Sequence, residues 1–279
     1  MKNYRLIRLE DEGDGVKRFV AVGRERKALG EIDVEFHDAI VDISFLYVPE
    51  EHRREGVGSF MLQSVIDILD DGDYFTPVEL RFPLDEENGS LMAFMHAQKN
   101  FYLEEAGTCF TISAADRKNS KNWKRMREID TDAVEYVKVD EKIRRKFAET
   151  LDEEGYADFL NDETAYDRRL CFARVNHDRV TAASFLRLTD EGKVEVSFLY
   201  AQEEHQKSLQ NVICASMYAV DELFPRADLV FTTVTPEGYA MGAKIFGEEG
   251  KRVPLFCARW DGISGAGLRE ACEMIGMEA

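Results

Sequence analysis

The feature that most constrains this chain is an internal repeat. The twelve residues Val41–His52 and the twelve residues Val194–His205 are identical at eight positions, at a shift of 153 residues. The same shift, without a gap, places Phe19 on Phe172. Such a repeat indicates two copies of one fold in tandem. The length of 279 residues is sufficient for two ordinary domains.

The repeated stretch predicts a buried strand followed by a helix. Val41–Val48 is an apolar, β-rich run that Pro49 ends. Apolar residues then fall on one helical face, at Val57, Phe60, Met61, Val65, Ile68 and Leu69. The turn between them contains Arg53, Arg54, Gly56 and Gly58. Glycines let backbone amides approach a ligand, and a helix N-terminus attracts phosphate. The turn is therefore a candidate pyrophosphate cradle; the alternative is a tight turn that binds nothing.

The same residues carry a family resemblance. Val-x-Pro, then Arg53-x-x-Gly56-x-Gly58 at a helix start, resembles the acetyl-coenzyme A signature of the GNAT acyltransferase superfamily. The resemblance implies an α+β (α/β) protein of two tandem GNAT-like domains, each with a mixed central sheet flanked by helices. It implies that the strand before the signature splays from its neighbour and holds the pantetheine arm, while the turn holds the pyrophosphate.

The resemblance also implies a set of residues that bind acetyl-CoA. Asn88 matches a position where the family often has an asparagine near the pantetheine or the phosphates, although it could equally cap a helix. The implied set is Leu46, Tyr47, Val48, Arg53, Arg54, Glu55, Gly56, Val57, Gly58, Ser59 and Asn88.

Hydrophobic patterning predicts similar elements in both copies, with two additional helices near the start of the second. In the first, we expect strands over 4–9, 19–23, 28–36, 40–48, 78–82 and 109–112, and helices from 56 to about 71 and over 88–105. In the second, we expect strands over 134–139, 170–175, 180–188, 194–200, 229–234 and 254–260. Helices are expected over 142–151, 156–160, 208–224 and 239–248, with a short one after the glycine-rich 262–267. A polar, basic link over 113–132 joins the copies. The predicted domains are 1–128, which binds cofactor and catalyses, and 129–279, a degenerate GNAT-like copy.

The link carries six basic residues in an acidic chain. They could contact an adenosine 3′-phosphate of the cofactor, be solvated, or pair with acids of the second copy. The cluster is Arg117, Lys118, Lys121, Lys124, Arg125 and Arg127.

Comparing the copies separates fold from function. His52 and Tyr47 recur as His205 and Tyr200, which indicates packing roles. Arg53, Arg54, Gly56 and Gly58 instead become Gln206, Lys207, Leu209 and Asn211. Side chains at the last two positions would fill the place of a diphosphate, so we expect the second copy to have lost its pocket. The first copy has only 18 residues before Phe19, so we expect the second copy to roof its acceptor site.

Acyl transfer to an amine needs a base, a group that polarises the carbonyl, and a proton for the leaving thiolate. The resemblance implies that a backbone N–H of Tyr47 or Val48 polarises the carbonyl. It implies a tyrosine acid on the helix after the next strand, where Tyr102 is the candidate, one residue out of the family's spacing to Gly107. Tyr102 could equally be a packed aromatic. Asp42 and Glu31 are the candidate bases, or exposed strand charges.

Composition narrows the partners. The formal charge is −18, from 36 basic and 54 acidic residues, which argues against nucleic acid or an anionic membrane and favours a cationic acceptor. Five scattered cysteines fit reduced thiols in the cytoplasm, and no metal-ligand spacing is present. We therefore expect a cytoplasmic N-acetyltransferase, monomeric or homodimeric, that acts on a small-molecule amine or a peptide. The alternative is a non-catalytic acyl-CoA-binding sensor or scaffold.

Overall fold

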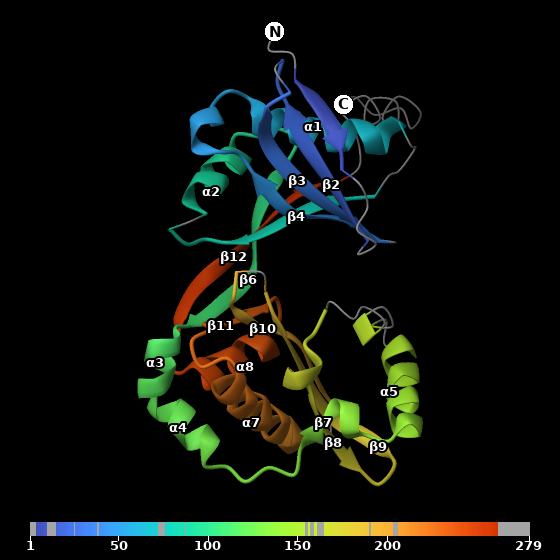
Figure 1. The fold of residues 1–279 in the computed structure, drawn as a ribbon, viewed down its shortest axis with the longest axis vertical. Helices are drawn as coiled ribbons and strands as arrows, with labels where there is room; N and C mark the ends of the chain where they lie inside the picture. Colours follow the sequence, from blue (N-terminus) through green and yellow to red (C-terminus); the bar gives the residue numbers. More distant parts are fainter. Residues whose placement is uncertain are drawn as a thin grey trace, which may run out of the picture. The chain divides into compact units, whose positions relative to one another are not determined.

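The computed structural model describes residues 4–9, 15–24, 26–37, 39–71, 76–86, 88–153, 156, 159–160, 165–189, 191–202 and 206–261. These residues form two compact units (Figure 1). The first contains the chain up to Ala106 and again from Leu255, and the second contains Gly107–Pro254. The units therefore divide the chain differently from the predicted boundary at 128/129. The glycine-rich segment and the expected terminal helix after residue 261 lie outside the described residues.

In the first unit the strands lie in the order β1-β2-β3-β4-β5-β12. Strands β1 to β4 form the expected antiparallel meander. β5 is parallel to β4 and antiparallel to β12. The strands are β1 (Arg5–Arg8), β2 (Val16–Val22), β3 (Ala28–Phe36), β4 (Val41–Tyr47), β5 (Val78–Pro83) and β12 (Lys251–Trp260).

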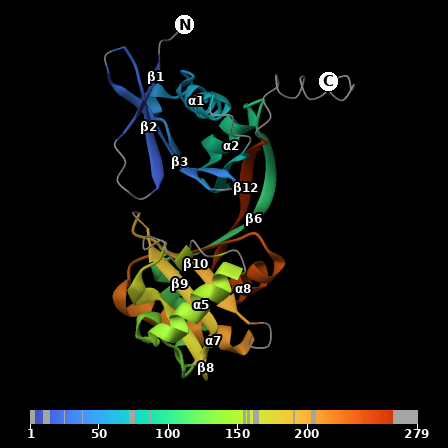
Figure 2. The same ribbon diagram turned by 90° about the vertical axis from the view of Figure 1, so that its right-hand side faces the viewer.

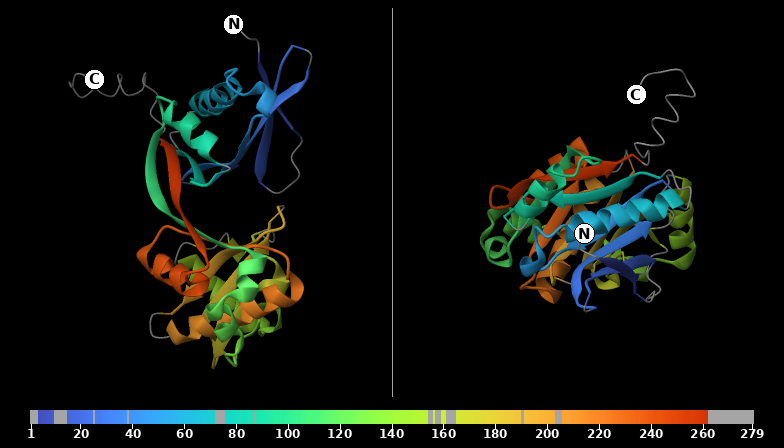
Figure 3. Two further views of the ribbon diagram at one scale, coloured as in Figure 1. Left: turned by 90° about the vertical axis from the view of Figure 1, so that its left-hand side faces the viewer. Right: turned by 90° about the horizontal axis from the view of Figure 1, so that it is seen from above.

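The two α-helices that the structure describes in this unit contribute to one hydrophobic core. The helix α1 (Val57–Asp71) buries Met61 and Leu69, and α2 (Gly89–His96) buries Met95, in the same cluster as Ile32 of β3. Figures 2 and 3 show the two helices on one side of the meander. Among the described residues of this unit, no helix packs on the opposite face of the meander. That face carries polar side chains, because in a strand they alternate with the buried ones.

The second unit has a sheet in the order β6-β11-β10-β9-β8-β7, with helices on both faces. On one face α5 buries Phe147 and Leu151. On the other face α4, α7 and α8 pack around Trp123, Ile213 and Phe246. The strands are β6 (Tyr102–Ile112), β7 (Val134–Glu135), β8 (Phe172–Asn176), β9 (Arg179–Leu188), β10 (Val194–Ala201) and β11 (Leu229–Thr233). The helices are α3 (Ala114–Asn119), α4 (Lys121–Arg127), α5 (Glu141–Glu153), α7 (Gln206–Leu223) and α8 (Pro236–Phe246).

The two copies exchange their last strands, which the sequence did not predict. Residues Thr108–Ile112 of β6 pair antiparallel with β11 of the second unit, and Leu255–Trp260 of β12 pair antiparallel with β5 of the first. The side chains follow the pairing: Phe110 and Ile112 belong to the second unit's core, and Trp260 belongs to the first. A period-two pattern indicates a strand, but the backbone groups on its edges pair with any other strand.

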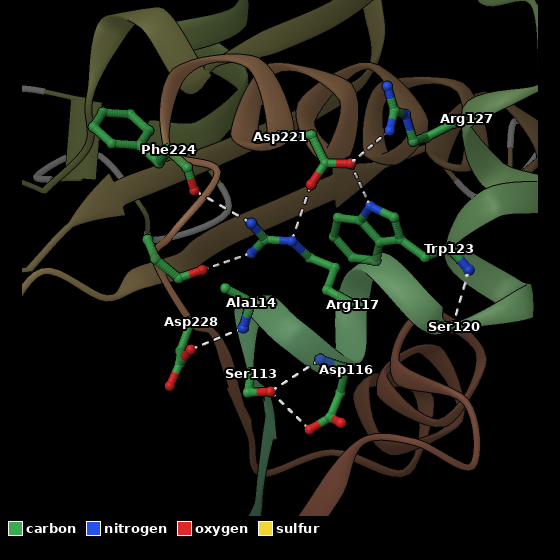
Figure 4. Close-up of polar contacts among 11 residues, drawn as sticks. Ser113, Ala114, Asp116, Arg117, Ser120, Trp123, Arg127, Asp221, Phe224 and Asp228 are labelled. Atoms are coloured by element: carbon green, nitrogen blue, oxygen red, sulfur yellow. Dashed lines mark hydrogen bonds and ion pairs between the residues drawn. The ribbon is translucent and has the colours of Figure 1, made fainter.

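The predicted link over 113–132 contains two short helices of the second unit. Ser113 and Ser120 begin α3 and α4, each accepting a hydrogen bond from the backbone N–H three residues later. Arg117 is fully buried; its Nε donates to Asp221 Oδ1 at 3.0 Å, and its other nitrogens donate to the carbonyls of Phe224 and Ala227 (Figure 4). For Arg117, therefore, pairing with an acid of the second unit is confirmed, whereas a solvated position is wrong.

Two expected elements are shorter than predicted. The helix predicted over 88–105 ends at His96, and β6 begins at Tyr102. The strand predicted over 134–139 pairs only at Val134 and Glu135, and a 3₁₀ turn (Tyr136–Lys138) follows. This turn buries the Tyr136 ring against Phe147 and Phe185, at centroid distances of 6.2 and 4.9 Å. Among the described helices, none is both long and apolar enough to cross a bilayer.

Candidate active site

The first element of the site is a gap between two parallel strands. β4 pairs with β5 only at Val41–Val78 and Asp42–Glu79. Beyond these two rungs β4 pairs with β3 alone, through Tyr47, and β5 pairs with β12. The edge of β4 that includes Leu46 and Tyr47 therefore diverges from β5, as the resemblance implied. Diverging strands leave main-chain donors and acceptors for a ligand.

The second element is the turn that follows β4. Arg54 has a φ of 60° and Gly56 a φ of 89°, both in the left-handed region that non-glycine residues avoid. Residues Arg53–Gly56 are exposed, as is Ser59, whereas Val57 is buried and begins α1. A Cβ at Gly56 would meet no atom within 4 Å, so the space beside it is open. The turn can therefore present bare amides at the start of α1.

Contacts that the sequence did not predict hold this turn in place. Tyr4 Oη donates to the Glu55 carbonyl at 2.7 Å, and its ring lies 5.4 Å from that of Phe60. Arg53 Nε donates to the Val48 carbonyl at 3.0 Å. His52 Nδ1 lies 3.6 Å from the Glu55 carboxylate. Because the Arg53 side chain is directed to the backbone of the loop, it braces the turn.

Two glycines, Gly30 and Gly58, allow α1 to pack closely against its neighbours. Only Gly58 belongs to the acetyl-CoA signature. A Cβ at Gly30 would lie 2.9 Å from the Tyr47 carbonyl oxygen and 3.2 Å from a Val57 methyl group. A Cβ at Gly58 would lie 2.9 Å from Cζ of Phe94 on α2. Gly58 therefore makes room for the Phe94 ring, whatever else it does for a ligand.

Asn88 precedes α2 but does not cap it with its side chain. Its Nδ2 donates to Asp85 Oδ1 at 3.0 Å, and its backbone N–H donates to the same oxygen at 2.9 Å. The side-chain oxygen of Asn88 makes no capping hydrogen bond. The Asp85 contact fixes the loop between β5 and α2, and a role of Asn88 toward a cofactor stays a prediction.

The candidate bases lie on the sheet face opposite α1. Glu31 of β3 is opposite Tyr47, and Asp42 of β4 is opposite both Glu35 and Glu79. Strand alternation puts Glu31, Glu35 and Asp42 on one face, while Ile32 and Ile43 point to the core. Glu35, Asp42 and Glu79 thus lie opposite one another in a row across β3, β4 and β5, and Glu31 lies on the same face of β3. The sequence reasoning missed Glu79, which a run of alternating residues in β5 could have indicated.

Asp42 has the environment of a base. Its Oδ1 is buried and has no hydrogen-bond partner among the described residues. Burial raises the pKa of Asp42, the nearby Arg81 lowers it in part, and Glu35 raises it further. Glu79 is 4% exposed and is paired with Arg81, and with Arg259 at 3.2 Å. Asp42 therefore combines a raised pKa with a buried oxygen that has no hydrogen-bond partner among the described residues.

Tyr102 does not lie on a helix, so the premise for its role as an acid was wrong. It begins β6, and its side chain is 43% exposed. Its hydroxyl donates to Asp261 Oδ1 at 3.1 Å. Partial burial raises the pKa of Tyr102, as do the hydrogen bond and the charge of Asp261. The shorter α2 is the physical reason: the chain leaves the helix six residues before Tyr102.

The second unit keeps the strand gap but not the turn. β10 pairs with β11 only at Val194–Leu229 and Glu195–Val230. The helix α7 already begins at Gln206, so Lys207 and Leu209 are helical where Arg54 and Gly56 form the turn. Nevertheless, a cavity of about 1000 Å³ lies between β10, β11, α4, α7 and α8. Leu209 lines the wall of this cavity without filling it, whereas helix replaces the turn that would hold a diphosphate. That the second copy has lost its cofactor pocket stays a prediction.

In the described part of the chain, no group of three or more His, Cys, Asp and Glu residues is arranged so that it could hold a metal ion. The side chains of Cys109, Cys171, Cys214 and Cys257 are buried. Burial raises the pKa of Cys171 to about 12, and raises that of Cys214 and of Cys257. Buried thiols of high pKa are poor nucleophiles.

Comparisons with solved structures identify the fold. A tandem GNAT protein from the clavulanic acid biosynthesis pathway is 10% identical over 88% of this chain and 82% of that protein, with a TM-score of 0.64. A GCN5-related N-acetyltransferase from Sphaerobacter thermophilus is 12% identical, over 91% and 82%, with a TM-score of 0.55. A GNAT-family acetyltransferase from Colwellia psychrerythraea is 9% identical, over 92% and 99%, with a TM-score of 0.54. No protein-family model and no curated protein matches the sequence.

The chain therefore has the GNAT acyltransferase fold, with a mixed sheet in each unit. It carries that fold twice, and in this it is similar to the tandem GNAT protein from the clavulanic acid pathway.

Proposed function

We propose that this protein is an N-acetyltransferase whose first unit binds acetyl-CoA and transfers the acetyl group to a primary amine. The observation that carries the proposal is the exposed turn at Arg54 and Gly56, with positive φ at both residues, beside the free edge of β4. Acyl transfer in general is supported by the fold that the chain shares with GNAT acetyltransferases.

The residues present fit acetyl-CoA. The open space at Gly56 and the free amides at the start of α1 suit a diphosphate, and the exposed Arg54 adds positive charge in an acidic protein. Leu46, Tyr47 and Val48 would hold the pantetheine arm along the free strand edge. Bound there, acetyl-CoA supplies the activated thioester.

The sheet face opposite α1 would receive the amine. It carries Glu31, Glu35 and Asp42, and the exposed rings of Phe45 and Tyr47 stack beside them at 6.1 Å. Carboxylates and aromatic faces both favour a cationic acceptor. Asp42, whose carboxylate is under-solvated and whose pKa is raised, would accept the proton that the ammonium must lose, directly or through water.

Tyr102 is the remaining candidate for the acid. The hydroxyl of Tyr102 already donates a hydrogen bond to Asp261. We therefore expect Tyr102→Phe to slow transfer less than threefold. This result would mean that Tyr102 only links β6 to Asp261. A loss of about 10²–10⁴ would instead identify it as the acid. Single-turnover measurements of acetyl transfer distinguish these outcomes, because product release cannot mask the chemical step.

The test of the function is an acetylation screen. The full chain is mixed with acetyl-CoA and a panel of mono-, di- and polyamines, amino sugars, amino acids and lysine peptides, and free thiol is measured. Amine-dependent thiol release that Gly56→Leu removes is the expected result. Binding of acetyl-CoA by calorimetry without turnover would instead support a non-catalytic sensor or scaffold.

A further inference from the structure

The cavity of the second unit has the features of a binding site of its own. The unpaired edges of β10 and β11 form its floor, and α7 and α8 form its walls. Its volume, about 1000 Å³, lies at the upper end of the range of roughly 300–1000 Å³ for ligand pockets. All of its lining residues lie in the second unit, between Asn122 and Ile245.

One end of this groove is closed by α4. Asn122 donates from its side chain to the carbonyls of Lys244 and Ile245 at the end of α8, to the latter at 3.0 Å. Arg125 follows Asn122 by three residues and so lies on the same side of α4. Arg125 and Lys244 are both exposed, and both line the groove at this end.

The charges are unequal at the two ends. Near the first residues of α7 and α8, Lys207 and Glu237 line the groove and have opposite charges. Near the last turn of α8, the charged residues that line the groove are Arg125 and Lys244. In a chain with a charge of −18, this pair of cations is suited to one anionic group.

The floor offers main-chain partners. β10 and β11 pair at two rungs only, so from Val196 to Ala201 the edge of β10 that faces β11 does not pair with it. Six residues of strand extend over about 20 Å. In the same stretch, Ser197 Oγ has no hydrogen-bond partner among the described residues, and Ser197 lines the groove.

The walls are mostly apolar. The side chains that line the groove from α4, α7, α8 and the two strands include Met126, Leu199, Ile213, Phe231, Met241 and Ile245. A ligand that forms hydrogen bonds with the strand edges of the floor and packs against the apolar walls must have both main-chain amides and apolar side chains.

We propose that the groove of the second unit binds a short, extended, apolar peptide with a free carboxylate, which Arg125 and Lys244 hold at the closed end. The peptide would pair with the free edge of β10, as added strands do at open sheet edges. A CoA diphosphate does not fit in the same way, because Lys207 and Leu209 are helical and form no turn of positive φ.

The test is calorimetric titration of the full chain with acetyl-Ala-Leu-Val-Leu. We expect saturable binding, at least tenfold weaker for the same peptide with a C-terminal amide and abolished when its alternate amides are N-methylated. Arg125→Gln and Lys244→Gln should each weaken binding at least fivefold. Lys124→Gln is the matched control, since Lys124 is the exposed neighbour of Arg125 but does not line the groove.

Four results would overturn the proposal: no binding, equal affinity for the amide, unchanged affinity in Arg125→Gln and Lys244→Gln, or equal or tighter binding of dodecanoate or CoA in this groove. Dodecanoate has the carboxylate and the apolar chain but no amides, so it isolates the contribution of the strand edge. Thermal melting of each variant verifies folding, and acetyl-CoA titration verifies that the first unit is unaffected.

Discussion

The two units use the same strand but begin the next helix differently. α1 begins at Val57, and the residue at the same place in the repeat is Gln210, yet α7 begins a turn earlier at Gln206. Gly56 accepts a φ of 89°, which Leu209 would adopt only at a cost of roughly 1–2 kcal/mol. A few substitutions thus convert an open turn of bare amides into a closed turn of helix, while the strand gap beside it persists.

The two helices are also held at opposite ends. Tyr4 and Arg53 fix the turn at the start of α1, each through a backbone carbonyl. The buried Arg117 fixes the end of α7, through Asp221 and two carbonyls. The first helix is therefore organised around its N-terminus, where a ligand can bind, and the second around its C-terminus, where the contacts stabilise the fold.

The largest expected effect tests the contacts by which Arg117 fixes the end of α7. Arg117→Met leaves Asp221 partly buried without its closest cation, so the second unit should lose about 3–5 kcal/mol of stability. Denaturant unfolding, followed by the fluorescence of the buried Trp123, measures the loss. Lys118→Met, at the exposed neighbouring position of α3, is the control and should change stability by less than about 0.5 kcal/mol. A loss below about 1 kcal/mol for Arg117→Met would mean that these contacts contribute little.

The next effect tests the turn. Gly56→Leu with Gly58→Asn gives the first unit the residues of the second, and the dissociation constant for acetyl-CoA should rise about 10²-fold or more. Hydrogen bonds to charged groups contribute about 1.5–3 kcal/mol each, and the substituted turn loses one or two of them. Calorimetry measures this dissociation constant. In the reciprocal variant, Leu209→Gly with Asn211→Gly, we expect the stoichiometry to stay at one acetyl-CoA per chain. Unchanged affinity in the first variant would remove the turn from the cofactor site.

A smaller effect separates packing from binding at Gly58. Gly58→Ala should destabilise the first unit by about 1–3 kcal/mol, because the new methyl group meets the Phe94 ring. Adding Phe94→Leu should restore most of that stability. Thermal melts of the single and double variants measure this coupling. If affinity for acetyl-CoA stays low in the double variant after stability recovers, the glycine also makes room for the ligand.

The smallest effect concerns Asp42. A raised pKa in the folded state means that the ionised carboxylate destabilises the fold. The penalty is absent below the ordinary pKa of 3.8 and grows as the pH rises through the folded value. Asp42→Asn should therefore melt at a higher temperature than the parent at pH 7, with a difference that shrinks toward pH 4. Glu31→Gln, at an exposed position, is the control. A difference that grows toward acid pH would contradict the assignment.

Local geometry was readable in the sequence. The run Val41–Val48 indicated a strand, Pro49 its end, and the glycines at 56 and 58 the turn before a helix, and the structure confirms each of these elements. The strand and the turn were predictable because the residues that form them are close together in the chain. The repeat of this stretch indicated two copies of one fold. The resemblance added the splayed strand, which the two-rung pairing of β4 with β5 confirms.

Only the tertiary structure decided which sheet each closing strand joins, that Arg117 is buried, and that Tyr102 lies on a strand beside Asp261. Each of these features depends on a contact with a residue more than 100 positions away in the chain. A strand edge or a guanidinium group can pair with many such residues. The sequence by itself determined the strand, the turn and the helix that follows. The fold determined their long-range partners. A backbone group or a charged side chain can pair with any suitable group, so its identity in the sequence does not specify its distant partner.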